Sequence, residues 1–220
     1  MDKGDIVIRD LRQEESHQVR EMLLSGLFTE VLTFRNAFKL TVNSENCVWV
    51  AILSVFFYIL TKSVALAALV PVILTVLTSF VCLWRDIQQH MSHTQVELQD
   101  LHAWYNNIEP DSKFWVAVYR QNIIGSAALH RASETVAELK RMSVLPMYRR
   151  QGVGTRLLKH FEEHCRSAGI RKALITASEF GPGVHLYQKC GYMINSTFHR
   201  RMLPLPGALK TEWTLSKKLN

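Results

Sequence analysis

The residues best suited to chemistry lie between an extended segment that ends at Pro146 and an apolar-periodic run that begins near Val153. They follow one another as Arg149, Arg150, Gln151, Gly152, Val153, Gly154 and Thr155. Backbone N–H groups in the first turn of a helix have no partner within the helix, and the helix dipole adds partial positive charge there. Glycines let a phosphate approach closely. The spacing of Gly152 and Gly154 matches neither the mononucleotide-binding P-loop nor the dinucleotide-binding fingerprint. The stretch therefore predicts a pyrophosphate site.

A second stretch, from Leu186 to Tyr192, places a tyrosine near the end of a helix, just before a glycine and an aromatic residue. The motif Arg149-x-x-Gly152-x-Gly154 resembles the acyl-CoA pyrophosphate loop of the GNAT acetyltransferase superfamily, and the second stretch resembles another signature of that superfamily. In this order, and about 35 residues apart, the two are more specific than either alone. With the apolar insert described below, nearly the whole chain resembles the camello-like, membrane-bound branch that includes cysteine-S-conjugate N-acetyltransferases.

The resemblance implies that acetyl-CoA is the co-substrate and that Tyr187 protonates the departing CoA thiolate. A phenol suits this role because it stays protonated at neutral pH. The alternative is that Tyr187 only packs beneath the cofactor. Relatives often carry an asparagine seven residues before this tyrosine, and Phe180 stands there instead. This departure leaves CoA binding in place but puts the path of the helix that carries Tyr187 in doubt.

Glu138 aligns with the glutamate that serves as general base in histone-acetylating relatives. Two alternatives remain open. In many relatives an ordered water removes the proton, and the nearby Glu134 and Lys140 are equally consistent with an outward-facing strand.

The thioester carbonyl is expected to be polarised by main-chain N–H groups, since the corresponding strand of the family bulges and splays away from its neighbour. The predicted donors belong to Met142, Ser143 and Val144. The loop from Arg149 to Thr155 is expected to hold the pyrophosphate, also through main-chain donors. The alternative for its two arginines is a solvated basic turn.

The apolar content of 48 % is concentrated in one segment, because Lys62 is the only charged residue from Cys47 to Trp84. Thr61-Lys62-Ser63 is flanked by two runs that would be apolar on every face as helices. A membrane hairpin that turns at this point is therefore expected. The first run is short, and a re-entrant loop remains an alternative to a full crossing. The charged first 40 residues predict no cleavable signal peptide.

The net charge of +7 arises mainly from residues 85–220, which carry 19 basic and 11 acidic side chains. Such a surface suits a phosphate-rich co-substrate or an anionic membrane, and no nucleic-acid-binding motif is present. The four cysteines lack metal-binding spacing, so no metal is expected.

The pattern of strands and helices predicts an α/β fold with a mixed sheet and one parallel crossover through the helix at 153–165, which is the GNAT fold with an inserted membrane hairpin. The expected parts are 1–45 (first strand and helices), 46–84 (membrane hairpin), 85–110 (amphipathic connecting helix) and 111–220 (acetyl-CoA-binding core).

The sequence thus predicts a membrane-anchored N-acetyltransferase that acts on a small amino-acid-like amine such as a cysteine S-conjugate. Acetylation of protein lysines is a second hypothesis, and a non-catalytic CoA-binding or interaction protein is a third. The resemblance implies the endoplasmic reticulum membrane. The 19 basic residues after the insert favour the cytosolic side for the catalytic part.

Overall fold

The computed structural model describes residues 5–42, 44–109, 111–205 and 207–219, without the side chains of Ser44 and His93. The part boundaries predicted at residues 1, 110 and 220 lie outside the described residues. The chain forms two compact units. The sheet unit comprises residues 1–27, 94–197 and 212–220, and the hairpin unit comprises residues 28–93 and 198–211.

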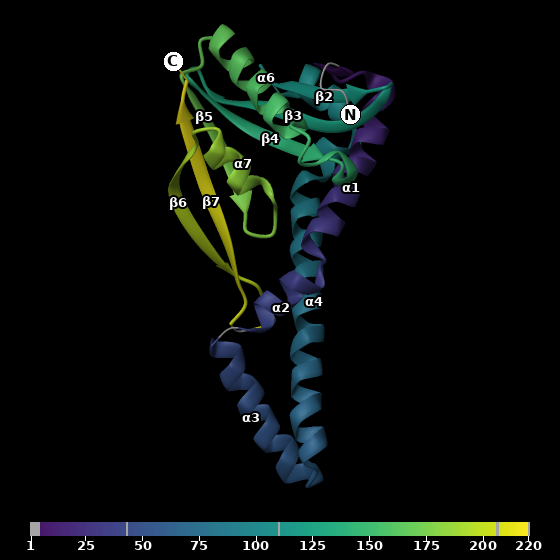
Figure 1. The fold of residues 1–220 in the computed structure, drawn as a ribbon, viewed down its shortest axis with the longest axis vertical. Helices are drawn as coiled ribbons and strands as arrows, with labels where there is room; N and C mark the ends of the chain where they lie inside the picture. Colours follow the sequence, from purple (N-terminus) through teal and green to yellow (C-terminus); the bar gives the residue numbers. More distant parts are fainter. Residues whose placement is uncertain (1–4, 43, 110, 206, 220) are drawn as a thin grey trace. The chain divides into compact units, whose positions relative to one another are not determined.

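A seven-stranded mixed sheet organises the chain, with the strand order β1-β2-β3-β4-β5-β7-β6 (Figure 1). The strands are β1 (Ile6–Asp10), β2 (Lys113–Tyr119), β3 (Asn122–Ser133), β4 (Val136–Val144), β5 (Lys172–Ser178), β6 (Met193–Arg201) and β7 (Leu209–Lys218). β4 and β5 run parallel and are joined through α6 (Val153–Ser167), whereas β1–β2, β2–β3, β3–β4 and β5–β7 are antiparallel. The predicted mixed α/β fold and its crossover helix are confirmed.

In the sheet unit, hydrophobic side chains pack on both faces of the sheet. α6 covers one face, where Leu157, Leu158 and Phe161 are fully buried. The other face packs Val19 of α1 (Ser16–Val31) and Leu101 of α5 (Leu101–Ala103) against strand residues. Since both faces are covered, the apolar runs of the central strands are explained by burial on two sides.

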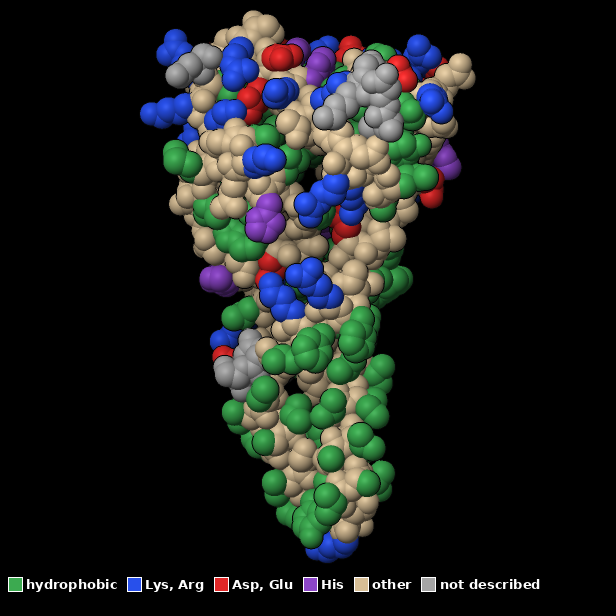
Figure 2. Space-filling view, in the orientation of Figure 1, with side chains coloured by type: hydrophobic (Ala, Val, Ile, Leu, Met, Phe, Trp, Pro, Cys, Tyr) green, Lys and Arg blue, Asp and Glu red, His purple; other side chains and the backbone are tan. Residues whose placement is uncertain are grey.

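The hairpin unit consists mainly of α2 (Phe34–Thr41), α3 (Ser44–Thr61) and most of α4 (Val64–Gln99). The turn predicted at Thr61-Lys62-Ser63 is confirmed, because α3 ends at Thr61 and Lys62 adopts a left-handed φ of 53°. Val64–Ser92 is long and apolar enough to cross a membrane, and an 18-residue window within it has a mean hydropathy of 2.5. α2 and α3 pass that test only together, across a 77° bend. Figure 2 shows hydrophobic side chains exposed along the hairpin.

Two helices run further than the sequence predicts. The sequence pattern predicts a helix from about Ser16 to Gly26, whereas α1 continues through Gly26 to Val31. α4 passes Arg85 without a break, so the predicted connecting helix is largely its continuation. α4 ends at Gln99, where the Asp100 side chain accepts a hydrogen bond from the Ala103 N–H at 3.0 Å and begins α5. A π-helical turn (Trp104–Ile108) follows.

Candidate active site

The ends of β4 and β5 separate in the sheet unit. In the described register, β4 pairs with β5 only from Val136 to Leu139, whose partner is Ile175. β5 continues to Ser178 against β7, and β4 continues to Val144 against β3 (Figure 1). The main chain of β4 beyond Leu139 therefore has one side that does not pair with β5.

A β-bulge lies in this last part of β4. Ser126 pairs with Ser143, but Ala128 pairs with Lys140, so β4 holds one more residue than β3 over this step. The extra residue is accommodated at Arg141, which has a left-handed φ of 51°. A bulge turns the strand and changes the direction of its main-chain groups. The bulge thus lies directly before Met142, Ser143 and Val144, the predicted donors, whose role stays a prediction.

Two neighbours hold the bulge. The guanidinium of Arg141 donates to both carboxylate oxygens of Glu97, near the end of α4, at 2.6 and 2.5 Å. Burial acts to raise the pKa of Glu97, but the hydrogen bonds and charge of Arg141 outweigh it, and the pKa lies below its ordinary value. Burial and the adjacent carboxylate raise the pKa of Tyr105, whose hydroxyl donates to Glu97 at 2.6 Å. Ser126 Oγ also donates to the Arg141 carbonyl at 2.9 Å.

We expect Glu97→Gln to lower the midpoint of thermal unfolding at pH 7 by roughly 5–10 °C, because it leaves the Arg141 guanidinium, in a side chain only 15 % exposed, without its charge partner. Since the folded pKa of Glu97 is lowered, the carboxylate stabilises the fold at pH values above the ordinary carboxyl pKa, and this contribution is lost as the pH falls through the folded value. The difference in unfolding midpoint between wild type and variant should therefore decrease at acidic pH. Thermal unfolding followed by circular dichroism at several pH values measures both effects.

Arg131→Gln is the matched control, because it also removes one partner of an ion pair but at the surface. Arg131 binds Asp111 at 3.2 Å, and the Asp111 side chain is 68 % exposed. Exposed pairs contribute little, so a change of no more than about 2 °C is expected. Equal effects of the two substitutions would show that the Glu97 pair does not stabilise the bulge.

The predicted phosphate loop follows β4 directly. A 3-10 turn (Pro146–Tyr148) leads into it, and Arg149 Nε donates to the Val144 carbonyl at 2.8 Å, which fastens the loop to the end of β4. Arg150 is exposed and has a φ of 62°. Gly152 has a φ of 86° and precedes the first residue of α6. The loop therefore presents the start of α6 next to the bulged end of β4.

The two glycines of the loop have different surroundings. A Cβ at Gly152 would meet no atom within 4 Å, so this position is open and needs glycine only for its φ. A Cβ at Gly154 would lie 3.0 Å from the Leu186 side chain and 3.3 Å from that of Met142. Gly154 thus lets α6, β4 and the helix that carries Tyr187 approach one another. An open, left-handed glycine at a helix start fits the approach of a phosphate.

Tyr187 lies on α7 (Gly183–Lys189) and is only 8 % exposed. Its ring belongs to the core cluster that also contains Val153 and against which Met142 and Val144 pack. The fold thus brings Tyr187, the start of α6 and the predicted main-chain donors together. Its ring also lies over Gly183, where a Cβ would be 2.8 Å from Tyr187 Cε2 and 3.1 Å from Tyr187 Oη.

We expect Gly183→Ala to lower kcat of the predicted acetyl transfer by about 10-fold or more, because the new methyl group must displace the Tyr187 phenol. The affinity for acetyl-CoA should not change. Steady-state kinetics together with isothermal titration separates the two effects. Gly181→Ala is the control, since its Cβ would lie an ordinary 3.6 Å from the Ser178 carbonyl. If both variants keep wild-type kcat, the position of the phenol does not matter to the reaction.

Glu138 lies on the other side of β4 from this cluster. Its sequence neighbours Ala137 and Leu139 face the core, so Glu138 faces away from it. Its carboxylate accepts a hydrogen bond from Thr176 Oγ1 at 3.1 Å and lies 3.7 Å from Lys140 Nζ. The side chain is 26 % exposed, at the last rungs before β4 and β5 separate. Its position agrees with a base at the mouth of the separation and with a solvated strand residue, so its role stays a prediction.

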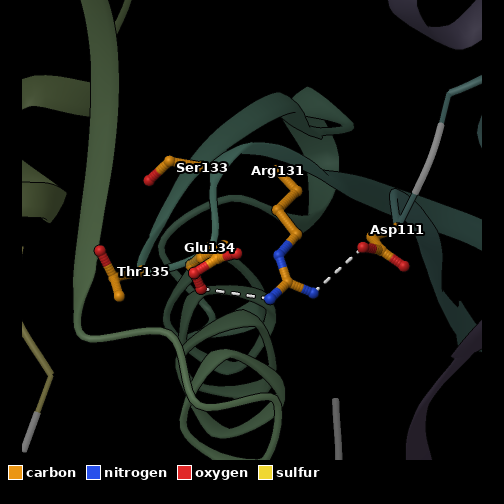
Figure 3. Close-up of a pocket in the computed structure, with 5 residues that line it drawn as sticks. All are labelled: Asp111, Arg131, Ser133, Glu134 and Thr135. Carbon is orange, nitrogen blue, oxygen red and sulfur yellow. Dashed lines mark hydrogen bonds and ion pairs between the residues drawn. The ribbon is translucent and has the colours of Figure 1, made fainter.

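A surface pocket of about 640 Å³ lies elsewhere on the sheet unit (Figure 3). It is lined by Asp111, Arg131, Ser133, Glu134 and Thr135. Four of these residues lie at the turn from β3 to β4, and Asp111 precedes β2. The bulge and the phosphate loop lie at the other end of β4, so the pocket contains none of the predicted site residues. Among the described residues, no group of three His, Cys, Asp or Glu side chains is placed to hold a metal ion.

Sequence reasoning missed three residues near the candidate site, namely Glu97, Arg141 and Gly183. Glu97 and Arg141 are 44 residues apart, and neither local sequence contains a pattern that predicts their pairing. Gly183 could have been identified from the sequence, because residues four apart on a helix are neighbours and this glycine lies four residues before Tyr187.

Known proteins resemble the chain over most of its length. A profile of the acetyltransferase (GNAT) family matches residues 79–192. The "Probable N-acetyltransferase 14" of Xenopus tropicalis is 32 % identical over 197 residues, which cover 88 % of this chain and 89 % of the relative. The N-acetylaspartate synthetase of Danio rerio is 25 % identical over 199 residues, covering 86 % and 67 %. The crystal structure of a GNAT acetyltransferase from Staphylococcus aureus Mu50 superposes with a TM-score of 0.55 at 16 % identity, covering 98 % of this chain and 99 % of that one, and shows the same fold. The chain therefore belongs to the GNAT family of acetyltransferases.

Proposed function

We propose that this acetyl-CoA-dependent N-acetyltransferase is anchored in a membrane and acetylates the amine of a small, carboxylate-bearing amino acid. The observation that carries the proposed site is the contact of three elements within the sheet unit. A Cβ at Gly154, in the first turn of α6, would lie 3.0 Å from Leu186 of α7 and 3.3 Å from Met142 at the bulged end of β4. The Tyr187 phenol of α7 belongs to the same core cluster as Val153 at the start of α6. In a GNAT chain, these elements supply a carbonyl-polarising group, an anion site and an acid.

Each group has a defined task in this proposal. Main-chain donors of the loop and the first turn of α6 bind the pyrophosphate of acetyl-CoA, with Arg149 and Arg150 adding positive charge. The neutral amine attacks the thioester carbonyl carbon, and the N–H groups near Met142 to Val144 stabilise the negative charge that develops on the carbonyl oxygen. As the C–S bond breaks, Tyr187 donates its proton to the thiolate. The attacking nitrogen loses one proton to water as the amide forms, and water returns a proton to the tyrosinate. Glu138, or a water, accepts the proton of the ammonium before attack.

The acceptor class rests on the resemblance and on the names of relatives. Four of the N-acetylaspartate synthetases come from Danio rerio, rats, mice and humans, each about a quarter identical to this chain. An acidic amino acid and a cysteine S-conjugate share an α-amine next to a carboxylate, so both belong to the class proposed. A lysine side chain within a protein lacks that carboxylate, and it is the alternative acceptor.

A thiol-release assay over a panel of amines tests this proposal. The purified protein is offered acetyl-CoA with aspartate, glutamate, S-benzylcysteine, free lysine, or a lysine peptide with blocked termini. Acetyl transfer to the α-amino acids, at a kcat/KM well above that for the peptide, is expected. Preference for the blocked peptide would identify a protein lysine acetyltransferase instead. Acetyl-CoA binding by isothermal titration without transfer to any amine would support a non-catalytic protein.

Membrane anchoring is supported by the surface of the hairpin unit. Large apolar side chains on both of its long helices are about half exposed or more, among them Ile52, Val55, Leu69, Ile73 and Leu77. In water this exposure would be unfavourable, whereas in lipid it is not. The endoplasmic reticulum as the location remains a prediction from the resemblance.

The sheet adds a constraint on topology. β1 precedes the hairpin and β2 follows it, yet the two strands pair from Ile6–Tyr119 to Asp10–Trp115. A sheet cannot form across a bilayer, so both flanks of an inserted hairpin must lie on the same side. In sealed microsomes, external protease should therefore remove both an N-terminal and a C-terminal tag, or protect both. Protection of only one tag would show a single crossing.

A further inference from the structure

We propose that the hairpin unit carries a collar that binds the headgroups of anionic phospholipids. This inference rests on the proposed membrane anchoring and adds a lipid preference to it. The collar consists of α2 with the following Val42, the residues around Trp84 and Arg85 on α4, and residues 198–205 and 207–211, which include the ends of β6 and β7 in the hairpin unit.

Side-chain contacts within the hairpin unit fasten the parts of the collar to one short stretch of α4. Thr41, at the end of α2, shares a hydrogen bond with Ser79 of α4 at 2.9 Å. Cys82 of α4 donates to the carbonyl of Met202, just after β6, at 3.3 Å. The collar is therefore built around α4 from Ser79 onward.

The buried carboxylate of Asp86 continues this attachment. Lys210 Nζ of β7 donates to it at 2.9 Å, and the guanidinium of Arg200 on β6 also contacts it. Arg200 further donates to Gln89 Oε1 at 2.9 Å. These contacts fix the ends of both strands to α4 about two to three turns beyond Ser79.

The collar lies at the depth of a membrane surface. With a rise of about 1.5 Å per residue, Ser79 and Asp86 are roughly 22 and 33 Å along α4 from the hairpin turn at Val64. The hydrocarbon core of a bilayer is about 30 Å thick. If the hairpin tip lies near the far interface, the collar meets the headgroups on the near side.

The exposed residues of the collar combine apolar and basic side chains. Asn36, Ala37 and Leu40 of α2 are buried, and the opposite face exposes aromatic and basic residues. The exposed apolar residues of the collar are Phe34 (69 %), Phe38 (56 %), Val42 (58 %), Trp84 (49 %), Phe198 (58 %) and Leu203 (66 %). The exposed basic residues are Arg35, Lys39, Arg85, Arg200 and Arg201. Aromatic and basic residues together are typical of a helix that lies in the interface of an anionic membrane.

Charge complementarity selects the occupant. Apart from Lys62 at the hairpin turn, the hairpin unit has six Lys or Arg and three Asp or Glu residues, which leaves a net charge of +3 at the collar. Asp86 already offsets part of the charge of Arg200 and Lys210, whereas Arg35, Arg85 and Arg201 face outward. The apolar residues between them continue the apolar surface of the hairpin, so a lipid headgroup with its acyl chains fits this surface better than a nucleic acid.

Native mass spectrometry of the full chain in mild detergent tests the collar. The protein is incubated with equal amounts of phosphatidylserine and phosphatidylcholine, and the retained lipids are counted. Wild type should prefer phosphatidylserine, and Arg35→Gln/Arg201→Gln should reduce that preference by on the order of tenfold. Arg171→Gln/Lys172→Gln is the matched control, because it removes the same charge from two exposed residues of the sheet unit and should keep the preference.

Flotation with vesicles of phosphatidylcholine alone separates the inference from the anchoring on which it rests. Wild type and both double variants should float with these vesicles, since the hairpin remains intact. Flotation without any preference for phosphatidylserine, or an equal loss of preference in both double variants, would overturn the collar and leave the anchor standing. Failure of the wild type to float would overturn the anchor itself.

Discussion

Replacing Gly152 with aspartate is expected to weaken acetyl-CoA binding by about 100-fold or more, whereas asparagine at the same position should keep the affinity within a few-fold. Both side chains tolerate the left-handed φ of 86°, and neither meets an atom within 4 Å at its Cβ. The two variants therefore differ mainly by one negative charge. At about 5 Å and an effective dielectric constant near 20, the repulsion between two unit charges is about 3 kcal/mol, which corresponds to more than 100-fold in affinity.

Isothermal titration with acetyl-CoA measures this difference, and circular dichroism establishes that both variants are folded. The neighbouring Gly154 is unsuitable for the experiment, because a side chain there would collide with Leu186 and Met142 and would change the packing as well as the charge. Equal dissociation constants for Gly152→Asp and Gly152→Asn would place the pyrophosphate elsewhere.

Tyr187→Phe is expected to lower kcat by about 100-fold or more with little change in acetyl-CoA affinity. A proton donor acts only as the C–S bond breaks, so its loss appears in kcat and not in ground-state binding. The ring itself remains, and with it the packing of the core cluster. Rapid-mixing kinetics of thiol release with saturating amine isolates the chemical step.

Tyr192→Phe provides the matched control for this experiment. Its ring centroid lies 6.2 Å from that of Tyr187, and Tyr192 is only 2 % exposed. Removing its hydroxyl changes the polarity of the same cluster without removing the predicted donor, so kcat should stay within a few-fold of wild type. An unchanged kcat in Tyr187→Phe would return that residue to the packing role that the sequence left open.

Much of the fold could be predicted because its signals are local. Hydrophobic patterning and turn residues predict strands at 113–119 and 172–178, which are the bounds of β2 and β5. Lys62 marks the break between the two long helices. The helix ends were harder. Gly26 costs an isolated helix only about 1 kcal/mol, and tertiary packing of α1 outweighs that cost. Arg85 is a good helix former, so a change from apolar to charged residues did not end α4.

The parts of the candidate site that depend on local main-chain geometry could be predicted from the sequence. The parts that depend on contacts between side chains far apart in the sequence could not. The glycine spacing predicted a loop that opens a helix, and α6 does begin directly after Gly152. The resemblance predicted that β4 bulges near this point. It did not predict that Arg141 occupies the bulge in a left-handed conformation. That conformation costs about 1–2 kcal/mol for a residue with a side chain, and it persists because Glu97 and Ser126 hold the residue.

The pairing of β1 with β2 also determines when this protein can finish folding. Ile6 leaves the ribosome more than 100 residues before its partner Tyr119. At translation rates of about 5–20 residues per second, β1 remains without its partner for roughly 5–20 s, while α3 and α4 are made. Because these helices fold back on themselves, they bring the two ends of the intervening segment together and reduce the entropic cost of closing so long a loop. The first strand of the sheet can therefore pair with β2 only after all the residues of α3 and α4 have been made.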